Sequence, residues 1–164
     1  MINKLNFKLK QAEFFISKLE ITEDVFEREC YFSAYLAALK SVWYYIQTWM
    51  LKNSKISNKS VFWKRVDNWT NKKCTRDEAT KWKCISNVRN TDIHEEPVTP
   101  EKLVSNSYWP IGYWAEGYWP DNYWPALKEL KITDPKTNKT YFLIDTCKVS
   151  IDITRRLIKV YKTM

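Results

Sequence analysis

The sequence predicts an all-α domain, built as a bundle of four or five helices. Hydrophobic residues make up 45% of the 164 residues, which is enough for one buried core. Only 2 residues are glycine, so few turns with positive φ are expected, and this suits helices better than a β-sandwich. Apolar side chains also recur at steps of three and four, the period of an amphipathic helix.

Residues 2–20 and 24–52 predict two antiparallel helices joined by a short connection. The apolar stripe of the first is Ile2, Leu5, Leu9, Ala12, Ile16 and Leu19. The stripe of the second is Tyr35, Leu39, Val42, Ile46 and Trp49. Small residues run beside this second stripe and favour close helix packing. Asp24 stands three residues before Glu27, which predicts a capping box at the second helix.

The next helical region covers residues 60–73 and 75–96, as one kinked helix or as two. Phe62, Val66 and Trp69 form a short stripe, and Thr75 with Glu78 predicts another capping box. This region should end by Pro97, because the residue before a proline avoids the helical conformation. A last helix is predicted at 146–162, capped by Asp145. Its inward residues would be Val149, Ile153, Leu157 and Val160.

Residues 101–144 form an insertion before the last helix of this single domain. A Tyr-Trp pair recurs there every five residues, beginning at positions 108, 113, 118 and 123. Prolines and glycines within the repeat predict an extended loop or a series of turns. Residues 128–133 and 140–144 then predict a β-hairpin. For the aromatic repeat we favour packing on the bundle; contact with a partner and stacking on RNA bases are the alternatives.

The formal net charge of +8 favours anionic partners such as RNA, DNA or acidic proteins, with a solvated lysine surface as the alternative. The four cysteines fit no CxxC metal pattern, so reduced thiols and no metal site are expected. No run is long and apolar enough for a signal peptide or a membrane span. These features predict a cytoplasmic protein with no membrane contact and no cofactor.

The residues best suited to chemistry are Arg89, Asn90 and His94. His94 is the chain's one histidine and titrates near neutral pH, as a general acid or base must. Arginine presents fixed donors to phosphate oxygens, and asparagine can orient either group. On a regular helix Asn90 and His94 share a face, whereas Arg89 points about 140° away from His94. The two would converge through a long arginine side chain, a distorted helix end or a second copy of the chain.

Each of these residues also has a structural interpretation. His94 fits a histidine near a helix end, bonded to a backbone carbonyl. Arg89 fits a surface ion pair with Asp92, Glu95 or Glu96, worth about 0–1 kcal/mol. Spacing alone favours the structural role for His94.

The pattern Arg-Asn-x-x-x-His at residues 89–94 resembles the signature of HEPN-domain proteins, the higher eukaryotes and prokaryotes nucleotide-binding superfamily. The aromatic and small-residue segment 31–42 and the run Glu95-Glu96-Pro97 are similar to the same family. The resemblance covers roughly residues 1–100 and the last helix. It implies a HEPN-like bundle that dimerises and places two such motifs in one cleft. It also implies that Arg89 and His94 are catalytic and that Asn90 occupies the polar position that often follows the arginine in this family.

The first functional hypothesis is therefore a metal-independent endoribonuclease that cleaves RNA by attack of the 2′-hydroxyl, as a toxin or antiviral effector. We expect Lys64, Arg65 and Lys81 to contact RNA. One histidine cannot easily serve as both acid and base, so a homodimer is expected, and an antitoxin protein is a further candidate partner. The second hypothesis is a non-catalytic HEPN-like module that binds a nucleotide or a partner protein.

Overall fold

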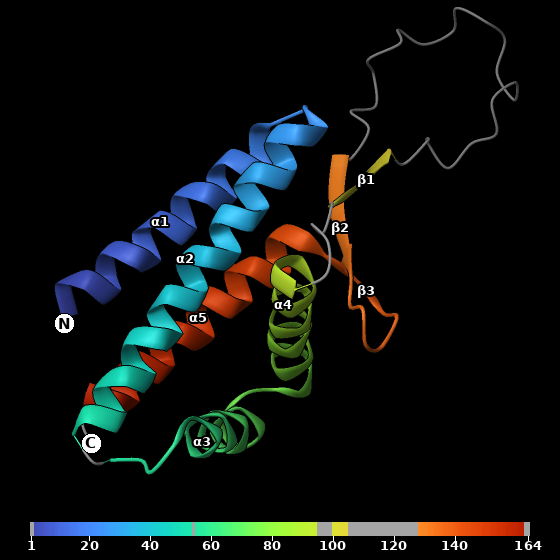
Figure 1. The fold of residues 1–164 in the computed structure, drawn as a ribbon. Coiled ribbons are helices and arrows are strands. Elements are labelled where there is room, and N and C mark those ends of the chain that lie inside the picture. The colour runs from blue at the N-terminus through green and yellow to red at the C-terminus, as the bar shows by residue number, and fades with distance from the viewer. Residues whose placement is uncertain (1, 54, 95–99, 105–127, 163–164) are drawn as a thin grey trace, which may run out of the picture.

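The computed structural model describes residues 2–53, 55–94, 100–104 and 128–162. Two long helices, α1 (Ile2–Ile21) and α2 (Val25–Lys52), lie side by side and run in opposite directions (Figure 1). The predicted stripe of α1 is buried wherever its side chains are described, and in α2 only Trp49 of the predicted stripe is partly exposed. Asp24 caps α2 by accepting from Glu27 N at 2.8 Å. The carboxylate of Glu27 accepts from the Thr22 hydroxyl, so this is half of the predicted capping box.

The third helical region is two helices, α3 (Lys59–Lys73) and α4 (Arg76–His94). The break falls at Cys74 and Thr75. Here the predicted capping box is complete, because Thr75 N donates to the Glu78 carboxylate at 2.8 Å and Glu78 N donates to the Thr75 hydroxyl at 3.2 Å. Two bonds therefore fix the start of the helix that carries Arg89.

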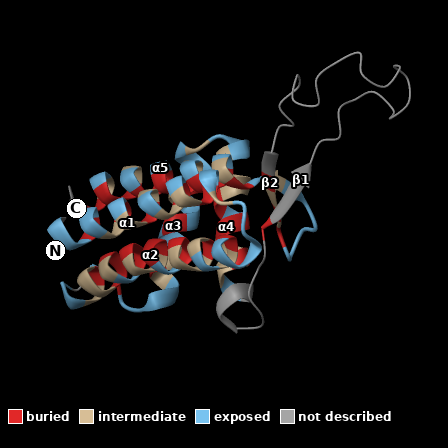
Figure 2. Ribbon diagram, turned by 90° about the horizontal axis from the view of Figure 1, so that it is seen from above, coloured by how far each residue is buried: buried red, intermediate tan, exposed pale blue. Residues whose placement is uncertain are grey.

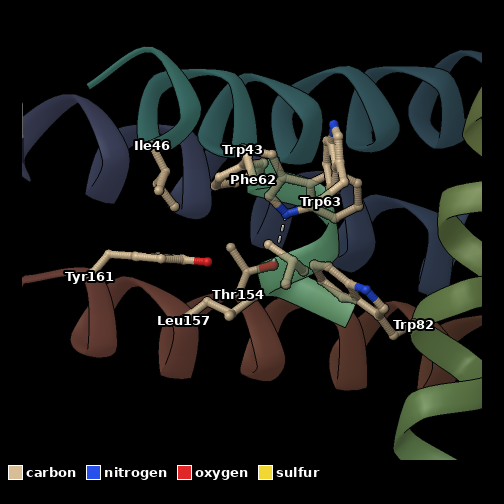
Figure 3. A pocket seen from close by; sticks show the side chains of 9 residues that line it. Trp43, Ile46, Phe62, Trp63, Trp82, Thr154, Leu157 and Tyr161 are labelled. Atoms are coloured by element: carbon tan, nitrogen blue, oxygen red, sulfur yellow. Dashed lines mark hydrogen bonds between the residues drawn. The ribbon is translucent and has the colours of Figure 1, made fainter. Parts of the chain in front are cut away.

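A cluster of aromatic side chains attaches α3 to the bundle. Trp43 of α2 contacts Trp63 of α3 and Trp82 of α4, with ring centroids 5.6 and 4.6 Å apart. Phe62 stacks on Tyr161 at 6.0 Å. These rings line a small apolar pocket where α2, α3, α4 and the last helix meet (Figure 3).

A small antiparallel sheet stands beside α4, with strand order β1-β2-β3. The predicted hairpin is confirmed as β2 (Lys128–Thr133) and β3 (Thr140–Phe142). A third strand, β1 (Glu101–Val104), pairs with β2 and was not predicted. The Tyr-Trp repeat at 108–125 lies outside the described residues.

The last helix, α5 (Leu143–Lys162), begins directly after β3, three residues earlier than predicted. Asp145 consequently lies in its first turn rather than at its cap. One face of α5 is buried among the other helices, as Figure 2 shows. Its polar core contacts are satisfied: Tyr35 donates to the Cys147 carbonyl, and the Trp43 indole donates to Thr154, both at 3.2 Å. Among the described helices, none is long and apolar enough to cross a membrane.

Candidate functional site

The candidate motif occupies the last two turns of α4, which is helical through His94. Asn90 and His94 are thus four positions apart on one helix, and Arg89 and His94 are about 140° apart around its axis. The His94 side chain lies outside the described part of the chain, and so do Asp92, Glu95 and Glu96, the carboxylates considered for an ion pair with Arg89. The site must therefore be built from Arg89, Asn90 and the side chains that surround them.

Arg89 is partly buried against the bundle, whereas Asn90 is exposed. The Nη1 atom of Arg89 donates to the Asn90 side-chain oxygen at 2.9 Å, so Asn90 orients the guanidinium. The Nε atom is buried and has no hydrogen-bond partner in the described part of the chain. Burial lowers the pKa of Arg89, although a guanidinium remains charged at neutral pH. Among the described residues, the charged group therefore has one donor, Nε, without an acceptor.

A second cation, Lys40 of α2, lies within electrostatic range of Arg89. The helices α2 and α4 touch through the rings of Trp43 and Trp82, whose centroids are 4.6 Å apart. Lys40 is one turn before Trp43 and Arg89 is two turns after Trp82, and the two charges are near enough for Arg89 to affect the pKa of Lys40. Burial, and then the charge of Arg89, lowers the pKa of Lys40.

No carboxylate from the described residues pairs with Lys40 or Arg89. Two neighbouring cations that are partly removed from water, with no described counter-charge, are electrostatically suited to an anion. A phosphate group fits the chemistry, because arginine donates to phosphate oxygens in a fixed geometry and lysine adds a point charge.

The other basic residues expected at an RNA surface do not gather with Arg89. The Lys81 ammonium lies 2.6 Å from Asp77 and 2.7 Å from Asp145, and these pairs tie the start of α4 to the start of α5. The hydrogen bonds that the ammonium donates to Asp145 and Asp77 raise the pKa of Lys81. Lys64 and Arg65 are exposed on α3, which lies near the opposite end of α4 from Arg89 (Figure 1). The first turn of α4 and Arg89 are about 20 Å apart along the helix axis, and an RNA chain would have to cross this distance to reach both.

The opposite side of α4 holds the hairpin. Asp134, which is 2% exposed, accepts from the Asn87 amide at 3.0 Å, from Lys136 N at 2.9 Å and from the Thr137 hydroxyl at 2.9 Å. Asn138 takes the left-handed conformation, with φ of 57°, that the turn after Asp134 requires. A buried carboxylate with several donors thus fixes the sheet beside the C-terminal half of α4.

The cysteines offer no nucleophile near this site. Burial, followed by the charge of Asp134, raises the pKa of Cys84 to about 12. Burial also raises the pKa of Cys147. Both thiols therefore stay protonated at neutral pH, and a protonated thiol is a poor nucleophile. Among the side chains that the structure describes, no three His, Cys, Asp or Glu residues gather as metal ligands.

Sequence reasoning missed Lys40 as a member of the site. A signal was present, because Lys40 is the one charged residue between Glu29 and Lys52 in a long helix of small and aromatic residues. Its electrostatic interaction with Arg89 joins positions 49 apart in the chain, and helical periodicity within one segment does not reveal such an interaction.

The fold and this site together define a helical protein with a small sheet and two interacting cations, one on α2 and one on α4. No family model matches the chain, and neither do the curated proteins or the solved structures.

Proposed function

We propose that this chain is a metal-independent endoribonuclease of the HEPN type, acting in the cytoplasm as a toxin or antiviral effector. The observation that carries the proposal is the pair of partly desolvated cations Lys40, on α2, and Arg89, on the helix α4 that ends at His94. The Arg-Asn-x-x-x-His pattern adds the one side chain that titrates near neutral pH. An antitoxin that restrains the activity belongs to the same proposal.

The proposed reaction begins when the ribose 2′-oxygen attacks the adjacent phosphorus. The bond from phosphorus to the 5′-oxygen then breaks, which leaves a 2′,3′-cyclic phosphate and a 5′-hydroxyl. A general base removes the 2′-hydroxyl proton, and a general acid protonates the leaving oxygen. His94 serves in proton transfer, Arg89 and Lys40 stabilise the charge on the phosphate oxygens, and Asn90 orients Arg89.

A second copy of the chain completes this scheme. Each chain has one histidine, and the reaction needs a base and an acid in one turnover. The helical separation of Arg89 from His94 also favours a site shared by two chains. A homodimer would supply two histidines to one cleft.

The direct test is cleavage of RNA in the presence of EDTA. Arg89→Ala and His94→Ala should each reduce the cleavage rate by about a hundredfold or more. Arg76→Ala is the matched control, since Arg76 is an exposed arginine at the start of the same helix, and it should cleave like the wild type. Unchanged cleavage in both Arg89→Ala and His94→Ala would refute the proposal.

The alternative function is a non-catalytic HEPN-like module that binds a nucleotide or a partner protein. The same Lys40–Arg89 pair favours it, because two cations can hold a nucleotide phosphate without any proton transfer. Equilibrium binding of ATP and of single-stranded RNA would separate the two functions. Binding that is lost in Arg89→Ala, together with no cleavage by the wild type, would support the module.

A further inference from the structure

The outer face of α1 carries exposed apolar side chains in a single row. Phe7, Phe14 and Ile21 follow each other at intervals of seven residues and are 58%, 52% and 71% exposed. Seven residues are close to two helical turns, so the three side chains line up over about 21 Å. They point away from the buried side of the helix, on which Leu9 and Ile16 lie.

The row widens at the connection between α1 and α2. Val25 is 51% exposed and Phe26 is 72% exposed, and both follow Ile21 within five residues. We call Phe7, Phe14, Ile21, Val25 and Phe26 the α1 row. Exposed large apolar side chains that lie together mark an interaction surface more often than scattered ones do.

Lysines flank the α1 row. Lys4 and Lys10 are exposed, and the ammonium groups of Lys8 and Lys18 lie 5.9 and 5.4 Å from the ring centroids of Phe7 and Phe14. These four are the basic residues of α1.

The two acidic residues of α1 are engaged elsewhere. Glu13 pairs with Arg155, and Glu20 pairs with Lys148 at 2.5 Å, both on α5. The charge that α1 offers to an incoming partner is therefore positive, and an acidic partner is complementary to it.

The shape of the row identifies the kind of acidic partner. Apolar positions with a seven-residue repeat drift by about 20° per repeat, so the row is a narrow stripe. A helix that lies on a lipid surface needs a much wider apolar face, whereas a narrow stripe suits the seam with one other helix. Lysines already cover ring faces of Phe7 and Phe14, where RNA bases would stack. Two copies of this face would bring lysines against lysines.

We propose that the α1 row docks an amphipathic helix of a partner protein, with apolar residues at heptad spacing and acidic residues on both flanks. The apolar side chains of the partner would pack between Phe7, Phe14 and Ile21. Its carboxylates would pair with the flanking lysines. This surface is separate from Arg89 and does not depend on the proposed nuclease.

The probe is a synthetic helix of about three heptads, with leucine at positions a and d and glutamate at e and g. A second peptide carries lysine in place of each glutamate. Titration calorimetry with the full chain should show binding of the acidic peptide, and binding of the basic peptide at least about tenfold weaker. The double variant Phe7→Ser and Phe14→Ser should bind the acidic peptide with an affinity lower by about tenfold or more, because it removes two apolar contacts.

Phe142→Ser is the matched control. Phe142 is 49% exposed and has Lys131 over its ring at 5.3 Å, yet it lies on β3 away from the row. Circular dichroism should show that all variants keep the wild-type helix content. Failure of the acidic peptide to bind, equal binding of both peptides, or equal losses in Phe142→Ser and in the double variant would each overturn the proposal. A third kind of result would also overturn it: the acidic peptide does not bind, whereas single-stranded RNA or anionic vesicles bind to the wild type and not to the double variant.

Discussion

Arg156 and Arg89 differ in the partners of their guanidinium groups. Arg156 donates to Glu78 at 2.7 Å and lies 3.0 Å from Asp152, so its charge joins α5 to the start of α4. Arg89 is partly buried, and its only described hydrogen bond goes to the neutral Asn90. A charge that is withdrawn from water without a counter-charge destabilises the fold, and such groups are commonly kept for function.

Replacing Arg89 with methionine should therefore separate stability from activity. Methionine keeps the aliphatic packing and removes the desolvated charge, so the free energy of unfolding should stay constant or rise by up to about 1 kcal/mol. RNA binding and cleavage should fall sharply in the same variant. Urea denaturation and an RNA-binding assay provide the two measurements.

Arg156→Met is the control for this comparison. It removes two ion pairs and should lower the free energy of unfolding by about 1–2 kcal/mol. A loss of stability in Arg89→Met as large as in Arg156→Met would contradict an anion-binding role and would indicate that Arg89 is structural.

Residues that lie within one helix were predicted well, and residues that meet across helices were not. The Thr75–Glu78 capping box is confirmed because both partners lie three positions apart in one turn. The ion pair of Lys81 with Asp145 was not predicted, because Asp145 comes from a helix 64 positions later. Lys40 and Arg89 are a similar case, since they interact electrostatically from two helices, α2 and α4, that meet at Trp43 and Trp82.

At the scale of the element, Glu78 fixes the first turn of α4. Its pKa is lowered from 4.5, first by the hydrogen bond from the Thr75 backbone and then by that from Arg156. The folded protein therefore binds fewer protons here than the unfolded chain does. The resulting stabilisation is fully present above about pH 4.5 and is lost as the pH falls through the lower pKa of the folded state.

Glu78→Gln should cost about 1 kcal/mol of stability at neutral pH, because the box and the contact with Arg156 both weaken. The difference from the wild type should shrink as the pH falls below about 4.5 and through the lower pKa of the folded state, where Glu78 of the folded wild type becomes neutral. Urea denaturation across that range measures it. Asp67→Asn, at an exposed carboxylate of α3, is the control, and its difference from the wild type should stay small. A Glu78→Gln difference that is constant with pH would contradict the linkage.

Elements with a strong internal pattern were also the ones that the sequence predicted. The stripes of α1, α2 and α5 repeat over many turns, and the β2–β3 hairpin has its turn in the sequence between the strands. β1 has four residues and no such pattern, and it becomes a strand by pairing with β2, whose partner residues lie 24–30 positions away. The early start of α5 follows from the Thr146 hydroxyl, which donates to the Phe142 carbonyl at 2.6 Å and closes a helical turn at the end of β3.

At the scale of the whole molecule, the main constraint on the proposed nuclease is its single histidine. One chain supplies a positively charged position from two helices, yet one imidazole cannot hold and donate a proton in the same step. The proposed dimer with two-fold symmetry would resolve this, because each chain would contribute one histidine to a shared cleft.

Mixing wild-type chains with His94→Ala chains tests the shared site. The mixture should contain equal amounts at constant total concentration and should be incubated until the subunits exchange. If both histidines of a dimer are needed, only the dimers of two wild-type chains cleave RNA, and the rate should fall to roughly a quarter of that of the pure wild type. If each chain works alone, the rate should be roughly half. Mixing with Arg76→Ala chains should leave the rate unchanged, which controls for dilution and exchange. A rate of one half would exclude the shared site while leaving the proposed RNA cleavage intact, because it would place a complete set of catalytic groups in each chain.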